Sequence, residues 1–175
     1  MYGASVLLEA LQILRDGGTK EVFFIGSLYA RDLPIGTLVT PSKAIDQAGI
    51  VLLDDPRAVE IRAGASEVRR LRSALNEANL RYREMEVVSV PAVLHDIAHI
   101  REFLSERTEA GVEMEVSTFY HFARKLELQA YALLYVSDNE NYDVISEAEV
   151  VQRAKRRGMR QATRVAVKLL GGDRA

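Results

Sequence analysis

Two carboxylates flank a methionine in the stretch GVEMEVSTFY, residues 111–120. Glu113 and Glu115 lie where an apolar segment typical of a buried strand runs into a segment typical of a helix. A buried carboxylate without a partner is strongly unfavourable, so a glutamate that folds inward here needs hydrogen-bond donors. The alternative is an exposed edge strand, in which period-2 alternation turns only Met114 inward.

Two further polar groups follow apolar segments. Gly26 and Ser27 come directly after EVFFI, and Ser137 and Asp138 come directly after YALLYV. Ligands of α/β sheets bind outside the carboxyl ends of the strands, so polar groups at three strand ends are candidates for one site. The alternative for Asp138 is a turn or helix-cap residue.

The apolar pattern predicts helices that alternate with strands. The expected helices are residues 5–16, 66–82 with Ser66 as the N-cap, 96–107, 117–128 and 146–170. The expected strands are residues 21–26, a pair within 36–53 formed by GTLVT and GIVLL, the segment around 86–90, 111–116 and 129–138. This order predicts an α/β fold, a three-layer αβα domain with a mixed, largely parallel central sheet.

Composition limits the function classes. The chain has 175 residues, of which 48% are hydrophobic, which fits a single domain with one sizeable core. Its net charge of −2 gives no broad attraction to nucleic acid or to an anionic membrane. The absence of cysteine excludes disulfides and thiolate catalysis, and no apolar run is long enough to span a bilayer. We therefore expect a cytoplasmic protein without nucleic-acid or membrane partners.

Histidines and a basic run give weaker signals. His95 and His99 have the i, i+4 spacing of a metal pair, but no third ligand is indicated, so surface or cap roles are preferred and no metal is expected. His121 is interpreted as a packing residue of an amphipathic helix. The run QRAKRRGMR, residues 152–160, is interpreted as a solvated helix face rather than a nucleic-acid site.

Three segments together resemble one enzyme family. GVEMEVSTFYHFARKLELQAYALLYVSD resembles the Glu-Met-Glu and Ser-Asp segments of the nucleoside phosphorylases and nucleosidases, the family of purine nucleoside phosphorylase, uridine phosphorylase and methylthioadenosine nucleosidase. VFFIGSLYARDLPIGTLVTPSKAI resembles the family's strand and Gly-Ser turn with its continuation, and MYGASVLLEALQIL resembles the preceding helix. The resemblance covers nearly the whole chain and implies a phosphorylase-like fold and a homo-oligomer, either a dimer, a trimer or a hexamer.

The resemblance also implies roles for the residues that end the strands. Glu115 corresponds to the glutamate that accepts hydrogen bonds from the ribose 2′- and 3′-hydroxyls, with Met114 beneath the sugar and Glu113 beside it in the substrate site. One carboxylate can accept hydrogen bonds from two vicinal hydroxyls and hold the sugar for cleavage at its anomeric carbon. Asp138 corresponds to the group that protonates or hydrogen-bonds N7 of a purine base, which improves the leaving group.

Other members of the implied site are placed by alignment alone. Gly26 and Ser27 correspond to the family's Gly-Ser turn, and Val93 stands where an aromatic residue often lines the sugar or base pocket. Ungapped alignment proposes Arg153 as the final-helix arginine that assists Asp138. Nearby Arg156, Arg157 and Arg160 are alternatives for that role.

Two departures from the family bear on the nucleophile. Phe24 stands where many phosphorylases have an arginine that holds phosphate, and the family's N-terminal phosphate loop has no counterpart, so residues 1–175 correspond to an N-terminally shortened domain. No cofactor is expected, apart from inorganic phosphate as a possible co-substrate.

Three hypotheses therefore remain. The first is an enzyme that cleaves nucleosides by phosphorolysis or hydrolysis, and the second is a non-catalytic relative that binds a nucleoside or serves as an assembly subunit. The third is a truncated chain. Purine and pyrimidine nucleosides are both compatible with the sequence.

Overall fold

A computed structural model of the chain describes residues 3–91, 105–142 and 148–171. The elements, in chain order, are α1 (Gly3–Asp16), β1 (Glu21–Tyr29), β2 (Leu38–Asp46), α2 (Ile50–Asp54), β3 (Glu60–Arg62), α3 (Ala65–Glu77), β4 (Tyr82–Ser89), β5 (Gly111–Glu113), α5 (Val116–Lys125), β6 (Gln129–Asp138) and α6 (Glu149–Gly171). The helices predicted at 5–16, 117–128 and 146–170 are confirmed as α1, α5 and α6. Most of the helix expected at 96–107 lies outside the described residues.

The six strands found among the described residues belong to one mixed sheet. Its order is β3-β2-β4-β5-β1-β6, and β2 also pairs with β6, so five of the strands close on themselves. The two longest ladders, β1 with β6 and β2 with β4, are parallel, and β4 with β5 is parallel as well. The pairs β1–β5, β2–β3 and β2–β6 are antiparallel. The predicted sheet segments near 21–26, 86–90, 111–116 and 130–136 therefore contribute strands to a single sheet, although the strand expected at 111–116 ends at Glu113.

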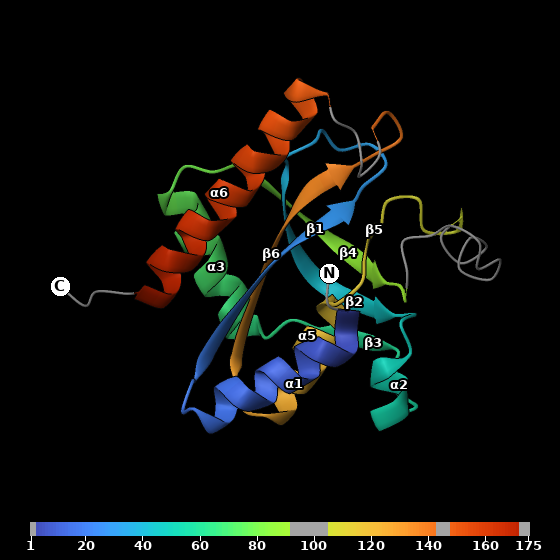
Figure 1. Cartoon of the computed structure of the whole chain (residues 1–175), viewed down its shortest axis with the longest axis vertical. Helices are drawn as coiled ribbons and strands as arrows, with labels where there is room; N and C mark the ends of the chain where they lie inside the picture. Colours follow the sequence, from blue (N-terminus) through green and yellow to red (C-terminus); the bar gives the residue numbers. More distant parts are fainter. Residues whose placement is uncertain (1–2, 92–104, 143–147, 172–175) are drawn as a thin grey trace.

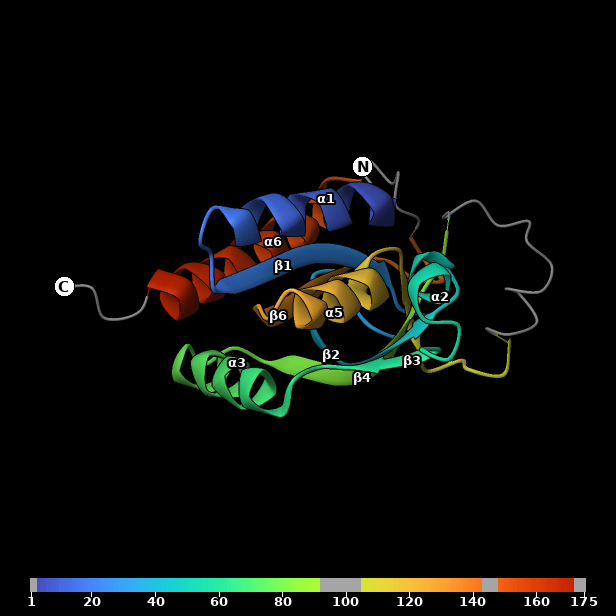
Figure 2. The same cartoon turned by 90° about the horizontal axis from the view of Figure 1, so that it is seen from below.

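Helices cover both faces of this sheet, which gives the predicted three layers (Figures 1 and 2). Buried side chains of α1, α2 and α5 form one core cluster with the strands, including Leu11, Val51, Phe119 and Phe122. Buried side chains of α3 and α6 form a second cluster, including Leu71, Leu75, Ala162, Val165 and Leu169. Among the described residues, no helix is both long enough and apolar enough to cross a membrane.

The predicted strand GIVLL is wrong, because residues 50–54 form the short helix α2. Gly49 has a left-handed backbone with φ 83°, which turns the chain out of the extended conformation after β2. Val51 is fully buried whereas Leu53 is 85% exposed, although strand alternation would place both on the same side. A five-residue apolar run carries too little periodicity to separate a short helix from a strand.

Two other predicted boundaries are wrong as well. The helix expected at 66–82 ends at Glu77, because Asn79 adopts a left-handed φ of 52° and the chain then enters β4. Ser66 does not cap this helix, since its hydroxyl bonds Glu67 and the N-cap residue is Gly64. The first strand does not end at residue 26 but continues to Tyr29.

A close contact of two glycines fixes α6 against the sheet. Gly36, in the turn before β2, has φ 83° and donates its N–H to the Val136 carbonyl at 2.8 Å. A Cβ atom on Gly36 would lie 2.5 Å from the Ala154 carbonyl oxygen, and one on Gly158 would lie 2.9 Å from Tyr135 Cβ. The backbone of α6 therefore packs directly on this turn and on β6, at the end of the sheet where Asp138 lies.

We predict that Gly36→Ala destabilises the protein more than Gly18→Ala does. Both glycines have a left-handed φ, so both variants carry backbone strain of roughly 1 kcal/mol. Only Gly36 is also crowded, because nothing lies within 4 Å of a Cβ atom on Gly18. Overpacking should add about 1–3 kcal/mol for Gly36→Ala, measurable as the free energy of unfolding in urea. Equal losses in the two variants would contradict this contact.

Candidate functional site

The carboxylate of Glu113 is buried and accepts hydrogen bonds from the start of α5. Its Oε2 atom accepts the backbone N–H groups of Glu115 at 2.6 Å and of Val116 at 2.8 Å, and its Oε1 atom accepts the hydroxyl of Ser89. The first N–H groups of a helix have no partner within the helix, and the helix dipole favours a negative charge there. The partner that the sequence requires for a buried glutamate is therefore a helix N-terminus of the same chain.

Three polar residues form a row across the carboxyl ends of neighbouring parallel strands. Asp46 ends β2, Ser89 ends β4 and Glu113 ends β5, and the register pairs Asp46 with Ser89 and Ser89 with Glu113. Ser117 of α5 completes the group, because its N–H donates to Ser89 Oγ at 2.9 Å and its hydroxyl donates to Asp46 Oδ1 at 2.8 Å. Sequence reasoning missed Asp46, Ser89 and Ser117; a signal was available for Ser89, which follows Val87 and Val88 near the end of the predicted strand 86–90.

Burial strongly affects the protonation of Glu113. Loss of hydration raises the pKa of Glu113 to about 7, against the opposing effect of the hydrogen bonds from Ser89, Glu115 and Val116. The neighbouring Glu115 carboxylate also raises the pKa of Glu113. Glu113 therefore titrates near neutral pH while it holds the first turn of α5.

Met114 and Glu115 form the corner between β5 and α5. Met114 is partly buried against the cluster that contains Ile45 and Val88. Glu115 is the N-cap residue of α5, and its carbonyl accepts the Phe119 N–H at 2.8 Å. Its side chain is partly exposed, and the remaining burial raises its pKa. The corner therefore has a fixed backbone and presents one carboxylate toward the surface.

The edge-strand alternative for this segment is wrong. β5 lies between β4 and β1 within the sheet, and the buried side chain is Glu113 rather than Met114 alone. Glu113 can point inward because the N–H groups at the start of α5 donate hydrogen bonds to its carboxylate. These bonds replace the hydrogen bonds to water that the carboxylate loses on burial.

Asp138 lies at the end of β6, and β1 separates β6 from β5 in the sheet. Tyr29, the last residue of β1, pairs with Asp138 in β6 and with Val112 in β5. Two strand spacings then separate Val112 from Asp138, roughly 10 Å. The Ser137 hydroxyl lies within hydrogen-bond distance of the Asp138 carboxylate and of the Leu28 carbonyl. The ends of β5 and β6, which carry the two recognised motifs, therefore flank the end of β1.

Gly26 and Ser27 lie in β1, two to three residues before its last residue, Tyr29. Ser27 pairs with Tyr135 of β6 and its side chain is exposed. Gly26 is covered by an aromatic ring, since a Cβ atom there would lie 2.7 Å from Phe24 Cε1. The ring of Phe24 itself packs at 5.4 Å from that of Phe119 in α5. The position where many phosphorylases have a phosphate-binding arginine is thus part of an apolar contact.

The structure does not bring Arg153 to Asp138. Arg153 lies in the first turns of α6 with its side chain 66% exposed, and its guanidinium pairs with Glu149 at 3.5 Å. Val93, proposed for the sugar or base pocket, lies outside the described residues, as do His95 and His99. Within the described residues, no group of three or more histidines, aspartates and glutamates could hold a metal ion.

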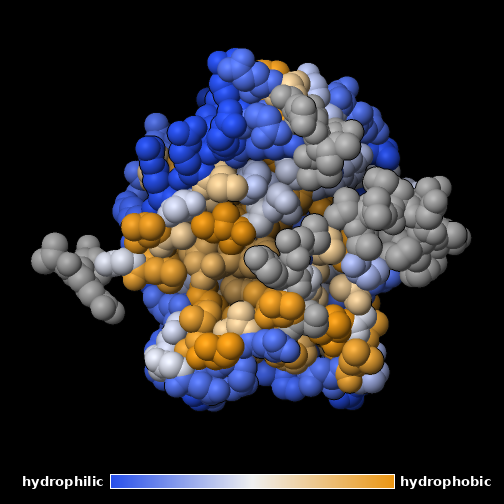
Figure 3. Space-filling model, viewed as in Figure 1, coloured by the Kyte–Doolittle hydropathy of each residue, from blue (hydrophilic) through white to orange (hydrophobic). Residues whose placement is uncertain are grey.

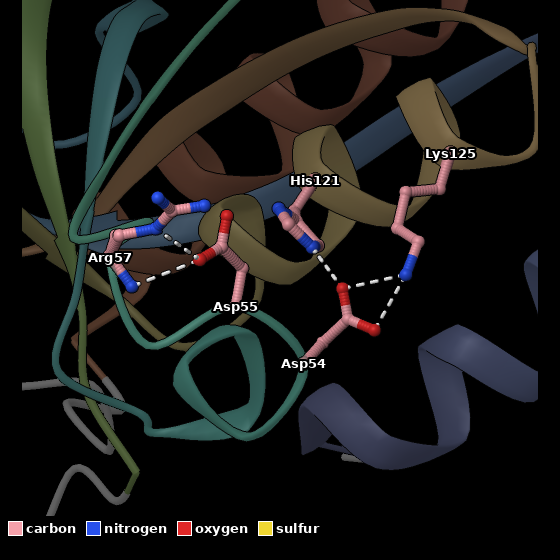
Figure 4. Close-up of polar contacts among 5 residues, drawn as sticks. All are labelled: Asp54, Asp55, Arg57, His121 and Lys125. Atoms are coloured by element: carbon pink, nitrogen blue, oxygen red, sulfur yellow. Dashed lines mark hydrogen bonds and ion pairs between the residues drawn. The ribbon is translucent and has the colours of Figure 1, made fainter.

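A separate polar cluster ties α5 to α2 (Figure 4). Asp54 accepts from His121 Nε2 at 2.8 Å and from Lys125 Nζ at 2.6 Å, and the bond to His121 is the main cause that lowers the pKa of Asp54. His121 also packs edge-on against Phe122, so it has a polar role in addition to the predicted packing role. Together with Glu113, this cluster holds α5 at both ends.

A small pocket between α3 and the sheet lies apart from the predicted site. Its lining includes Val68, Leu71, Tyr120 and Tyr131, and it contains none of the residues predicted from the sequence.

Comparison with known proteins identifies the family. The family model described as the phosphorylase superfamily matches residues 3–171. The chain belongs to the phosphorylase superfamily. A search of curated proteins found no match.

Solved structures share the fold of this superfamily member at low sequence identity. Uridine phosphorylase from Vibrio fischeri has a TM-score of 0.84 at 20% identity, and the match covers 97% of this chain and 70% of that one. The 5′-methylthioadenosine/S-adenosyl homocysteine nucleosidase of Campylobacter jejuni has a TM-score of 0.77 at 16% identity, with 97% and 77% covered. Futalosine hydrolase of Helicobacter pylori has a TM-score of 0.73 at 18% identity, with 95% and 76% covered. The predicted fold class and family resemblance are confirmed.

We predict that the stability of the protein falls as pH rises through the pKa of Glu113. Between the ordinary glutamate value of 4.5 and about 7, the folded chain binds more protons than the unfolded chain at this group. The free energy of unfolding should therefore decrease across this range, by about 3 kcal/mol in total, and level off above it. Urea denaturation at a series of pH values measures this slope.

Glu113→Gln should remove this part of the pH dependence, whatever its effect on absolute stability. Glu109→Gln, a change at an exposed glutamate just before β5, is the matched control and should keep the wild-type slope. Parallel curves for wild type and Glu113→Gln would show that Glu113 does not titrate in this range.

Proposed function

We propose that this protein cleaves the N-glycosidic bond of a purine nucleoside or of uridine. One observation supports this most directly. At the corner between β5 and α5, the partly exposed carboxylate of Glu115 extends from a backbone that hydrogen bonds hold on both sides. Membership of the phosphorylase superfamily agrees with it, and structures with this fold carry the names of uridine phosphorylase and of methylthioadenosine nucleosidase.

In the proposed reaction, Glu115 accepts hydrogen bonds from the ribose 2′- and 3′-hydroxyls while Met114 lies under the sugar. Asp138 donates a proton or a hydrogen bond to the base as the bond between the anomeric carbon and the base nitrogen breaks. The electron pair of that bond leaves with the base, and an oxygen of water or phosphate bonds to the anomeric carbon. The hydrogen bond between Ser137 and Asp138 supports this role, because it orients the carboxyl group.

A second candidate function is nucleoside binding without catalysis, as a binding or assembly subunit. Two observations favour it. Phe24 packs against Phe119 where many phosphorylases have a cation for phosphate, and Arg153 pairs with Glu149 rather than with Asp138. Both proposals require Glu115 to bind the sugar, and they differ in whether a nucleophile reaches the anomeric carbon.

Homo-oligomerisation is a further part of the proposal. Apolar side chains gather on one face of the molecule over α1 and near the end of α6 (Figure 3). Ile13 of α1 is 71% exposed and Val167 of α6 is 66% exposed. Exposed apolar surface of this kind is typical of protein interfaces. A light-scattering mass equal to the 19.5 kDa monomer at micromolar concentration would contradict the proposal.

We predict that the protein releases free base from at least one of inosine, adenosine, uridine and methylthioadenosine, and that this activity depends on Glu115. Glu115→Ala removes a charged acceptor for two hydroxyls, so kcat/KM should fall by roughly a hundredfold or more. Asp138→Asn should lower kcat more than it raises KM, because it removes the proton donor. Base release is measured by chromatography.

Glu109→Ala is the matched control, since Glu109 is an exposed glutamate two residues before β5. It should behave as wild type. If the protein binds one of the nucleosides through Glu115 and releases no base, the non-catalytic candidate is the correct one.

We further predict that phosphate changes the rate of base release little. Phosphorolysis needs positive groups that hold a dianion beneath the anomeric carbon, and Phe24 provides none. The rate should be the same within about twofold when phosphate replaces chloride at constant ionic strength. A rate that rises with phosphate and saturates, with ribose 1-phosphate as a product, would show that phosphate is bound by other groups.

A further inference from the structure

Four buried polar residues, Asp46, Ser117, Ser89 and Glu113, form a continuous chain of hydrogen bonds toward the proposed sugar site, which we call the relay. The Ser117 backbone N–H makes the link to Ser89. Asp46, Ser89 and Ser117 have no exposed surface, and Glu113 is 5% exposed. These residues come from three strand ends and from α5, so the relay joins parts of the chain that are far apart in sequence. Buried polar groups are costly unless hydrogen-bonded, and such a network is therefore a specific feature of the interior.

The donors and acceptors of the relay have one consistent assignment, in which donation runs from Ser117 toward Asp46 at one end and through Ser89 toward Glu113 at the other. The Ser117 hydroxyl donates to Asp46 Oδ1, and the other carboxylate oxygen of Asp46 accepts the Gly49 N–H at 3.2 Å. The Ser117 N–H donates to Ser89 Oγ, which leaves the single hydroxyl hydrogen of Ser89 for Glu113. Each serine thus has its one hydroxyl hydrogen directed to a carboxylate.

The relay ends at the backbone that carries Glu115. Glu113 accepts the N–H of Glu115, and the Glu115 carbonyl accepts the N–H of Phe119, so the peptide groups on both sides of the Glu115 side chain are fixed. A loss of one hydrogen bond at Ser89 would free the Glu113 carboxylate to turn, and the corner would loosen with it. A displacement of about 1 Å is enough to weaken a bidentate contact to a substrate.

We propose that Ser89, Ser117 and Asp46 are positioning residues for the ribose carboxylate Glu115, acting through Glu113. This inference rests on the proposed function, because it assigns Glu115 to the sugar. It predicts a selective defect: a loosened corner weakens contacts to ribose and leaves contacts to the base, at Asp138 across β1, in place.

The test compares the affinities for a nucleoside and for its free base in wild type and in Ser89→Ala and Ser117→Ala. The probes are the nucleoside among inosine, adenosine, uridine and methylthioadenosine that binds most tightly, and its own base, both by calorimetry. We expect the Kd for the nucleoside to rise by about tenfold or more in Ser89→Ala, and by a smaller factor in Ser117→Ala, which keeps the N–H that Ser89 accepts. The Kd for the base should be unchanged in both variants. Asp46→Asn keeps an acceptor for Ser117 and should retain more nucleoside affinity than Asp46→Ala.

Tyr120→Phe is the matched structural control. Tyr120 also belongs to α5, is buried, and donates its hydroxyl to the Pro41 carbonyl at 3.2 Å, outside the relay. Its variant loses one buried hydrogen bond, as Ser117→Ala does and against two in Ser89→Ala, and should keep the wild-type ratio of the two affinities. The proposal would be overturned if the serine variants weakened the affinities for nucleoside and base alike, or if Tyr120→Phe raised the Kd for the nucleoside by the same factor. Either result would mean that the relay contributes only to general stability.

Amide hydrogen exchange tests the relay without a ligand. The N–H groups of Glu115 and Val116 should exchange at least about tenfold faster in Ser89→Ala, faster by a smaller factor in Ser117→Ala, and at the wild-type rate in Tyr120→Phe. Nucleoside binding that requires Glu115 but is unchanged in Ser89→Ala would refute the positioning role alone. If wild type binds none of the four nucleosides, the proposed function fails and this inference fails with it, even where exchange at the corner is faster.

Discussion

The hydrogen bonds from the first amides of α5 to the Glu113 carboxylate are the interaction on which the candidate site depends. A carboxylate in this interior is stable only because helix N–H groups and a serine hydroxyl replace the water that it loses. The same bonds satisfy amides that have no partner within the helix. One side chain therefore ends β5, begins α5 and holds the Met114–Glu115 corner between them.

The mixed topology explains why β5, which leads into this corner, lies two strands from the end of β6 at Asp138. β1 and β6 run parallel to each other, while β2, β4 and β5 form a second parallel set. The two sets meet in the antiparallel β1–β5 and β2–β6 pairs, and the sheet closes through the latter. Because Tyr29 pairs with both Val112 and Asp138, the end of β1 keeps the other two strand ends at a fixed separation. Contact between Gly36 and α6 then limits how far the neighbouring helix can move.

Much of this arrangement could be predicted from the sequence, and the residues show why the remainder could not. The periodic segments of α1 and α6 and the long apolar run of β6 indicate their type by pattern. In GIVLL, five apolar residues contain too little pattern, and α2 was missed. The two glutamates of Glu-Met-Glu are equivalent in a hydropathy pattern, so only the structure distinguishes the buried Glu113 from the partly exposed Glu115. Asp46 and Ser89 look like ordinary turn residues until the register places them side by side.

The row of Asp46, Ser89 and Glu113 also has a consequence for the order in which the protein folds. Ser117 and Asp46 are separated by 71 positions in the chain, and their hydrogen bond forms only after β2, β4 and β5 have aligned. Contacts between distant segments close large loops and are slow to form. The corner should accordingly be among the last parts to take its final shape, and a partly folded chain would lack it. Any molecule that recognises this corner would thus select the completed domain over its folding intermediates.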